Sequence, residues 1–191
     1  MTKIFIIDCH PNGQSFSLGL FEQYIKGAQK AGHEVKSMRL SAMDFEIDLA
    51  KQDETDKMEP CLVEFQHKLT WCEHVVFISP LWWGFMPAKM KGLIDRVFLP
   101  QYAYAYDGKS ASPIKLLNGR SGDILVTSDT PNWYFNWIYR SAAFKIMRMQ
   151  IFEFVGIKPV KFHMFSPLRQ STERLRLKLL NRAWKLGNRV S

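Results

Sequence analysis

Short apolar runs alternate along the chain with longer segments in which apolar residues recur at helical spacing. The runs predict strands at residues 3–9, 33–40, 75–79, 123–128 and 159–165. The helical spacing predicts helices at residues 15–31, 61–72, 87–98, 133–155 and 171–187, with a loop over residues 44–59. Strands that alternate with helices are typical of βαβ units, and continuous apolar strands are typical of a parallel sheet covered on both faces. The pattern therefore predicts an α/β, three-layer sandwich with a five-stranded parallel sheet.

The number of strand–helix units also predicts how the sheet is wound. Five units match a doubly wound sheet with the strand order 2-1-3-4-5. No internal repeat, low-complexity tract or linker divides the sequence, so residues 1–191 are expected to form a single domain. In such a sheet the winding direction changes between the first and third strands, and ligands bind there, beyond the carboxyl ends of the strands.

The loop after the third predicted strand contains two adjacent tryptophans, Trp82 and Trp83, followed by Gly84. Turns favour small polar residues, so two indole rings at this position need an explanation. The rings could form the wall of a site for a flat aromatic ligand, and Gly84 would let the backbone approach that ligand closely. The alternative is that both rings pack beneath the loop as core residues.

The loop after the first strand, residues 9–17, precedes a predicted helix and is rich in hydrogen-bond donors. A helix amino terminus attracts anions through its free N–H groups and its dipole. His10, Ser15 and Ser17 add side-chain donors for a phosphate, although the serines could equally act only as helix caps. The loop lacks the G-x-G-x-x-G and Walker patterns. Combined with the tryptophan loop, it predicts a nucleotide site.

The loop after the fourth strand, residues 127–134, is expected at the same edge of the sheet. Its hydroxyl groups and backbone amides could hydrogen-bond the edge of a ring. Asp129 and Thr130 could equally cap the helix that follows. Tyr134 is the phenol near this loop that could donate a proton.

Positive charge is concentrated near the end of the chain. The net charge is +8, and residues 158–191 hold nine Lys/Arg against a single acid, Glu173. Five of these basic residues recur along one predicted helical face: Arg174, Lys178, Arg182, Lys185 and Arg189. This face is either simply solvated, or it contacts an acidic protein or the surface of an anionic membrane. Nucleic acid is not expected as a partner, because no aromatic residues interleave with the basic ones and no helix-turn-helix pattern is present.

The three cysteines, Cys9, Cys61 and Cys72, form no C-x-x-C pair. This spacing predicts neither a disulfide framework nor a zinc site, so no metal is expected, and it suits a reducing cytoplasm. No apolar stretch is long enough for a signal peptide or a membrane span, so a soluble cytoplasmic protein is expected.

Over roughly residues 3–165 the chain resembles the NAD(P)H:quinone oxidoreductase group of flavodoxin-like flavoenzymes. The resemblance is carried by His10 with Ser15-Phe16-Ser17, by the block Pro80-Leu81-Trp82-Trp83-Gly84-Phe85-Met86-Pro87, and by Lys91-Gly92 through Arg96-Val97-Phe98. It implies a flavodoxin-like fold. From the resemblance and the three loops together, we expect the flavin to be bound by His10, Ser15, Phe16, Ser17, Pro80, Leu81, Trp82, Trp83, Gly84, Phe85, Thr127, Ser128, Asp129 and Thr130.

The resemblance also implies an activity. The expected cofactor is FAD, with FMN as the alternative, and the expected hydride donor is NAD(P)H. A quinone-like acceptor would be reduced by ping-pong hydride transfer through flavin N5. Tyr134 falls near the family's active-site tyrosine and is the candidate catalytic residue, but no histidine follows it before His163, so the family's tyrosine–histidine pair is incomplete. Two alternatives are open: a non-enzymatic flavin electron carrier, and an ancillary subunit of a membrane potassium-efflux system.

Enzymes of this family build their active sites across a homodimer interface, so the resemblance implies a homodimer. Residues 99–106 provide a candidate contact, because Tyr102, Tyr104 and Tyr106 would lie on one face of an extended segment. The alternative is that the three rings cover the third predicted helix of the same subunit.

Overall fold

The computed structural model describes residues 1–49, 57–108 and 112–190. The strands of its large sheet are β1 (Lys3–Asp8), β2 (Glu34–Arg39), β3 (His74–Pro80), β6 (Ser121–Thr127) and β7 (Val160–Phe165). Their order is β2-β1-β3-β6-β7, and all neighbours are parallel. Counted within this sheet the order is 2-1-3-4-5, so the predicted flavodoxin-like fold is confirmed. The predicted loop at residues 44–59 lies partly outside the described residues.

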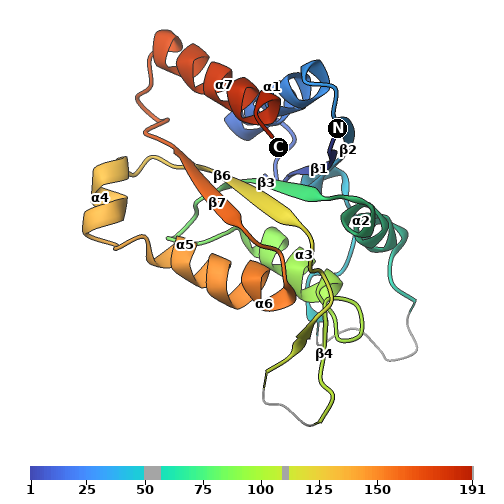
Figure 1. Ribbon diagram of the computed structural model, residues 1–191. Helices are drawn as coiled ribbons and strands as arrows, with labels where there is room; N and C mark the ends of the chain where they lie inside the picture. The colour runs from blue at the N-terminus through green and yellow to red at the C-terminus, as the bar shows by residue number, and fades with distance from the viewer. Residues whose placement is uncertain (50–56, 109–111, 191) are drawn as a thin grey trace.

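Helices cover both faces of the sheet (Figure 1). They are α1 (Phe16–Lys30), α2 (Pro60–Trp71), α3 (Ala88–Val97), α4 (Asn132–Trp137), α5 (Ala142–Ile146), the π-helix η3 (Met147–Phe152), α6 (Glu153–Val155) and α7 (Glu173–Asn188), with the 3-10 turn η1 (Leu40–Ala42) after β2. On one face, α1 and α7 pack over a core cluster that contains Ile4, Val76 and Leu125. On the other face, α2, α3 and the α5–α6 segment pack over a cluster that contains Phe5 and Phe77. Successive strand residues point to opposite faces, so both layers need apolar partners, as the continuous apolar runs predict.

The helix pair α1 and α7 depends on two glycines. A side chain at Gly27 would overlap the carbonyl oxygen of Trp184, and one at Gly187 would overlap the carbonyl oxygen of Tyr24. The two backbones therefore approach each other more closely than any other residue would allow. Gly32 follows α1 with a φ of 82°, as expected for a residue just beyond a helix end.

The predicted continuous helix over residues 133–155 is wrong. The segment is divided into α4 and a second stretch that runs from α5 through η3 to α6. Arg140 and Ser141 separate them, and both have a φ of 51°, which lies in the left-handed region. The Ser141 backbone N–H donates to the carbonyl of Phe135, and its hydroxyl donates to Asn136 Oδ1 at 2.9 Å. These two bonds stabilise the turn. It contains no glycine or proline, so the sequence gives no signal for it.

The prediction that three tyrosines share one extended face is also wrong. Residues 99–103 form a turn, and only Tyr104–Ala105 are extended, as strand β4, which pairs with β5 (Ile114–Lys115). The Tyr102 hydroxyl donates to the carbonyl of Gln66 on α2 at 2.9 Å, so this ring covers its own subunit. Tyr104 and Tyr106 do meet, with ring centroids 5.8 Å apart.

A largely buried polar cluster lies near the amino ends of β3 and β6 and the middle of β7, away from the edge where the predicted loops lie. The Tyr24 hydroxyl donates to Asp123 Oδ2 at 3.0 Å, and His163 Nε2 lies 3.1 Å from Asp123 Oδ1. His74 Nε2 lies 3.7 Å from the same carboxylate. Burial alone would raise the pKa of Asp123, but the favourable interactions with His163 and His74 outweigh it, so the pKa lies well below its usual range.

This low pKa predicts a stability effect that depends on pH. Because the folded-state pKa lies below the unfolded value of about 4, ionised Asp123 stabilises the fold above that pH, and the contribution is lost as the pH falls further. We expect Asp123→Asn to lower the free energy of unfolding by about 2 kcal/mol at pH 7. In urea denaturation the difference from wild type should shrink below about pH 4. Asp95→Asn, which removes an exposed pair with Lys91, is the control and should cost less than about 1 kcal/mol. An equal loss for Asp123→Asn at pH 7 and pH 3.5 would contradict the assignment.

The basic face of α7 is partly engaged in the fold. Arg182 Nη1 donates to the carbonyl of Met164 at 2.8 Å, and the guanidinium lies 4.8 Å from the centre of the Phe165 ring. Arg174, Lys178, Lys185 and Arg189 are exposed. Across the described residues, every helix is too short or too polar to span a bilayer.

Candidate functional site

The three predicted loops meet at the carboxyl edge of the sheet, beside the switch between β1 and β3. The backbone N–H of Leu81 donates to the carbonyl of Thr127 at 2.8 Å, which joins the second loop to the third. Ser17 Oγ and Thr127 Oγ1 lie 3.3 Å apart in a buried contact, which joins α1 to the third loop. The rings of His10 and Trp82 meet edge to face with centroids 5.6 Å apart, which joins the first loop to the second.

The tryptophan loop is a tight two-residue turn. The backbone N–H groups of Trp82 and Phe85 each donate to the other residue's carbonyl, at 2.8 and 2.9 Å. Trp83 and Gly84 form the tip, with φ values of 50° and 79°. A positive φ is costly for a bulky residue, and such strained residues cluster at functional sites as well as in tight turns. Trp83 is fully exposed, at 104%, so the alternative that its ring packs beneath the loop is wrong; Trp82 is 46% exposed.

The first loop presents hydrogen-bond donors at the start of α1. The backbone N–H of Asn12 lies 3.0 Å from His10 Nδ1. The same Nδ1 lies 3.1 Å from the carbonyl oxygen of Asn12, so these contacts fit either tautomer; in the tautomer in which Nδ1 accepts from the N–H, Nε2 carries the hydrogen and can donate. Ser15 Oγ caps the helix by accepting from the N–H of Leu18 at 3.3 Å, and its hydroxyl hydrogen can still donate. Phe16, the first residue of α1, has its ring 6.0 Å from the Arg176 guanidinium.

A carboxyl group lies beneath this loop. Asp8, the last residue of β1, is fully buried, and its Oδ1 accepts from the backbone N–H of His10 at 3.1 Å. Oδ2 has no hydrogen-bond partner among the described residues. Burial raises the pKa of Asp8, against the opposing effects of His10 and Arg39. Asp8 was missed as a site residue, although an acid that interrupts an apolar strand was a visible signal.

The third loop is rigidly held. Ser128 Oγ accepts from the backbone N–H of Thr130 at 3.0 Å. Asp129 Oδ1 accepts from the backbone N–H of Arg169 at 2.7 Å, which ties this loop to the one after β7. Pro131 occupies the cap position of α4, where no side chain caps the helix. The alternative role of Asp129 and Thr130 as helix caps is therefore wrong.

A cleft of about 630 Å³ lies beside the second and third loops. Its lining comes from Leu81, Trp83, Gly84, Thr130, Phe135, Tyr139, Ala142 and Ala143. Tyr139 was not predicted, because the expected continuous helix over residues 133–155 gave no reason for a residue in its second turn to reach this edge. Tyr134 contacts Tyr139 edge to face, with centroids 5.2 Å apart, and so lies next to the cleft.

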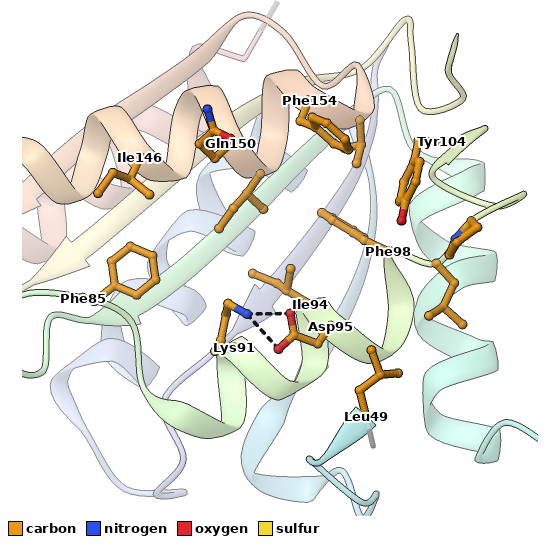
Figure 2. Close-up of a pocket in the computed structure, with 14 residues that line it drawn as sticks. Leu49, Phe85, Lys91, Ile94, Asp95, Phe98, Tyr104, Ile146, Gln150 and Phe154 are labelled. Atoms are coloured by element: carbon orange, nitrogen blue, oxygen red, sulfur yellow. Dashed lines mark hydrogen bonds and ion pairs between the residues drawn. The ribbon is translucent and has the colours of Figure 1, made fainter. Parts of the chain in front are cut away.

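A second hollow, of about 420 Å³, lies between α3 and the α5–α6 segment (Figure 2). Its lining is largely apolar and includes Ile94, Phe98, Tyr104, Ile146 and Phe154. Phe85 lines one end of this hollow rather than the cleft, and Pro80 is buried at the end of β3. Lys91 and Asp95 form an ion pair at 2.6 Å along α3.

Among the described residues, no group of three His, Cys, Asp or Glu side chains is arranged to hold a metal ion.

The fold and the three converging loops define a protein of the flavodoxin-like class. Residues 2–185 match the family model Flavodoxin_2, described as having a flavodoxin-like fold, and the chain belongs to this family. Its relatives include NAD(P)H:quinone oxidoreductases.

Three known proteins illustrate these relationships. A crystal structure of Smu.1420 from Streptococcus mutans is 30% identical, with a TM-score of 0.84, and the match covers 98% of this chain and 99% of that one. The rat protein NAD(P)H dehydrogenase [quinone] 1 is 27% identical over 54% of this chain and 46% of its own length, so this chain matches less than half of that enzyme. A Bacillus anthracis FMN-dependent NADH-azoreductase, solved with FMN, is 16% identical, with a TM-score of 0.74 over 99% of both chains, and shares the fold.

Proposed function

We propose that this chain is a flavin-dependent NAD(P)H oxidoreductase that reduces quinones or similar aromatic acceptors. The observation that carries the proposal is the cleft at the carboxyl edge of the sheet, walled by an exposed tryptophan on a strained turn. A bound flavin would supply the hydride chemistry, and the protein would hold and orient it. The proposed flavin is FAD, with FMN as the alternative.

The residues at the edge fit the parts of a flavin. Trp83 and Leu81 offer an apolar wall for the flat ring system, and the left-handed Gly84 leaves open space at the turn. Thr130 brings a hydroxyl group to the same cleft. On the phosphate side, the amino terminus of α1 and the donors of His10 and Ser15 suit an anion.

The test is to purify the protein, release its flavin by denaturation, and measure NADPH or NADH oxidation with a soluble quinone. A yellow protein that turns over many equivalents of quinone is expected. A protein that binds flavin but turns over neither donor would favour the electron-carrier alternative. A colourless protein that cannot be reconstituted with FAD or FMN would overturn the proposal.

Two phenols near the cleft are candidate proton donors to the acceptor's developing oxyanion. We expect Tyr139→Phe to slow flavin reoxidation by quinone about tenfold, because this ring lines the cleft and water can replace part of its effect. Tyr134→Phe should have the smaller effect, since Tyr134 contacts the cleft through Tyr139.

Stopped-flow experiments would time flavin reduction by NADPH and reoxidation by quinone separately. Both variants should reduce the flavin at the wild-type rate. If both variants also reoxidise at the wild-type rate, neither phenol has a chemical role.

We also propose that the protein is a homodimer with the cleft at or near the interface. The elements that contribute to the cleft, α4 with the residue after it and the α5–α6 segment, expose several large apolar side chains: Trp133, Trp137, Ile138, Ile146 and Met149. The Trp137 side chain is 80% exposed. Groups of exposed apolar side chains such as this one mark interfaces. Light scattering at micromolar concentration should give twice the chain mass; a fully active monomer would exclude a site that needs two subunits.

A further inference from the structure

A polar pocket of about 400 Å³ lies at the β7 edge of the sheet, bounded by α4, α5, η3 and α7. It shares no lining residue with the cleft described above. The two are nevertheless neighbours, because Phe135 and Tyr139 of the α4 region line the cleft, whereas Asn132 and Asn136 of α4 line the pocket. A helix is about 10 Å across, so one extended ligand could reach both.

Three cations from three elements line this pocket: Lys145 of α5, Arg148 of η3 and Arg182 of α7. No carboxylate lines it, and none of the three forms an ion pair with a described residue. Aromatic rings hold the two guanidinium groups, with Arg148 over Phe162 at 5.4 Å and Arg182 over Phe165 at 4.8 Å. Burial lowers the pKa of Arg182, yet an arginine stays protonated in proteins. Uncompensated positive charge is therefore held in place around a hollow.

The neutral polar groups of the pocket also leave donors free. The Ser141 hydroxyl donates to Asn136 Oδ1 at 2.9 Å, and Asn136 Nδ2 donates to Asn132 Oδ1 at 3.3 Å. Each amide oxygen thus already accepts a bond, while the Asn132 NH₂ group and one Asn136 hydrogen have no acceptor among the described residues. The lining as a whole offers N–H donors and positive charge.

We infer that this pocket binds a phosphate monoester dianion. A phosphate carries two charges and three terminal oxygens, which suits three cations and extra amide donors, whereas a carboxylate has only two oxygens. Two sources share this chemistry. One source is the 2′-phosphate of NADPH, which would reach the pocket across α4; this choice rests on the proposed function. The other source is a separate phosphate ligand.

Isothermal titration with inorganic phosphate and with adenosine 2′-monophosphate, at 0.15 M salt, tests the inference without any redox assay. We expect saturable binding by the wild-type protein, weakened at least about tenfold in the double variant Lys145→Gln/Arg148→Gln. Both residues are exposed and the Arg148–Phe162 contact is worth at most about 1 kcal/mol at such a site, so the variant should melt within a few degrees of wild type. The matched control, Arg174→Gln/Lys178→Gln, removes two exposed charges of α7 outside the pocket and should bind like wild type.

The two sources give different results. Tighter binding of the adenosine phosphate, with a pocket variant that loses kcat/KM for NADPH but not for NADH, supports the inference with NADPH as the source. Equal binding of both probes, with an unchanged donor preference, supports it with a separate phosphate ligand. No saturable binding of either probe, or equal weakening in the control variant, overturns it. A protein without oxidoreductase activity that still binds phosphate here would refute only the proposed function.

Discussion

Trp83→Ala should weaken flavin binding by about 100-fold or more and leave the stability of the flavin-free protein unchanged. Trp83 is fully exposed, so its ring contributes no packing to the folded chain. Covering roughly 100 Å² of indole face with a flavin is worth about 2.5 kcal/mol, and ring stacking adds about 0.5–1.5 kcal/mol. At about 1.4 kcal/mol for each tenfold change, a loss of about 3–4 kcal/mol corresponds to roughly two to three powers of ten in Kd. Fluorescence titration of the flavin-free protein with FAD and FMN would measure it.

The control for this variant is a tryptophan at the other end of the sheet. Trp71 lies at the end of α2, with the Lys36 ammonium 4.3 Å from its ring centre. Trp71→Ala should lower the melting temperature but leave flavin affinity within about twofold, because its ring is far from the carboxyl edge. Equal flavin affinity in Trp83→Ala and wild type would refute the placement of the ring system against this turn.

Gly27→Ala should cost about 3 kcal/mol of folding stability, although alanine is the better helix former by about 1 kcal/mol. Its new methyl group would overlap the backbone carbonyl oxygen of Trp184, which cannot rotate away as a side chain could. The variant must therefore separate α1 from α7 and loosen the cluster that holds Leu20 and Leu179. Urea or thermal denaturation monitored by circular dichroism would give the difference.

Gly19 of α1 provides the matched control for Gly27. A methyl group at Gly19 would lie 3.1 Å from Leu180 Cδ2, the tip of a flexible side chain. Gly19→Ala should therefore be neutral or stabilising by up to about 1 kcal/mol. If both alanine variants have the same stability, the close approach of α1 and α7 does not limit the fold.

Local sequence was sufficient to predict the strands, the order of the sheet and the meeting of three loops at one edge of it. Apolar runs mark strands buried on both faces, and connections between parallel strands follow few topologies. The loops around His10, Trp83 and Thr127 were therefore predicted at one edge, and the hydrogen bond from Leu81 to Thr127 is observed there. Ser15 as the cap of α1 also follows from local chemistry alone.

Only the tertiary structure decided where α4 ends and which side chains meet in the cleft and the polar pocket, because both depend on contacts between elements. The break at Arg140 and Ser141 has no local signal, because it is held by bonds from Ser141 to Phe135 and Asn136. That break places Tyr139 at the cleft. It also places Asn136 beside Arg182, which is 46 positions away in the chain, in the polar pocket. A helical period shows which residues share a face, whereas packing between elements decides where a helix ends and what that face meets.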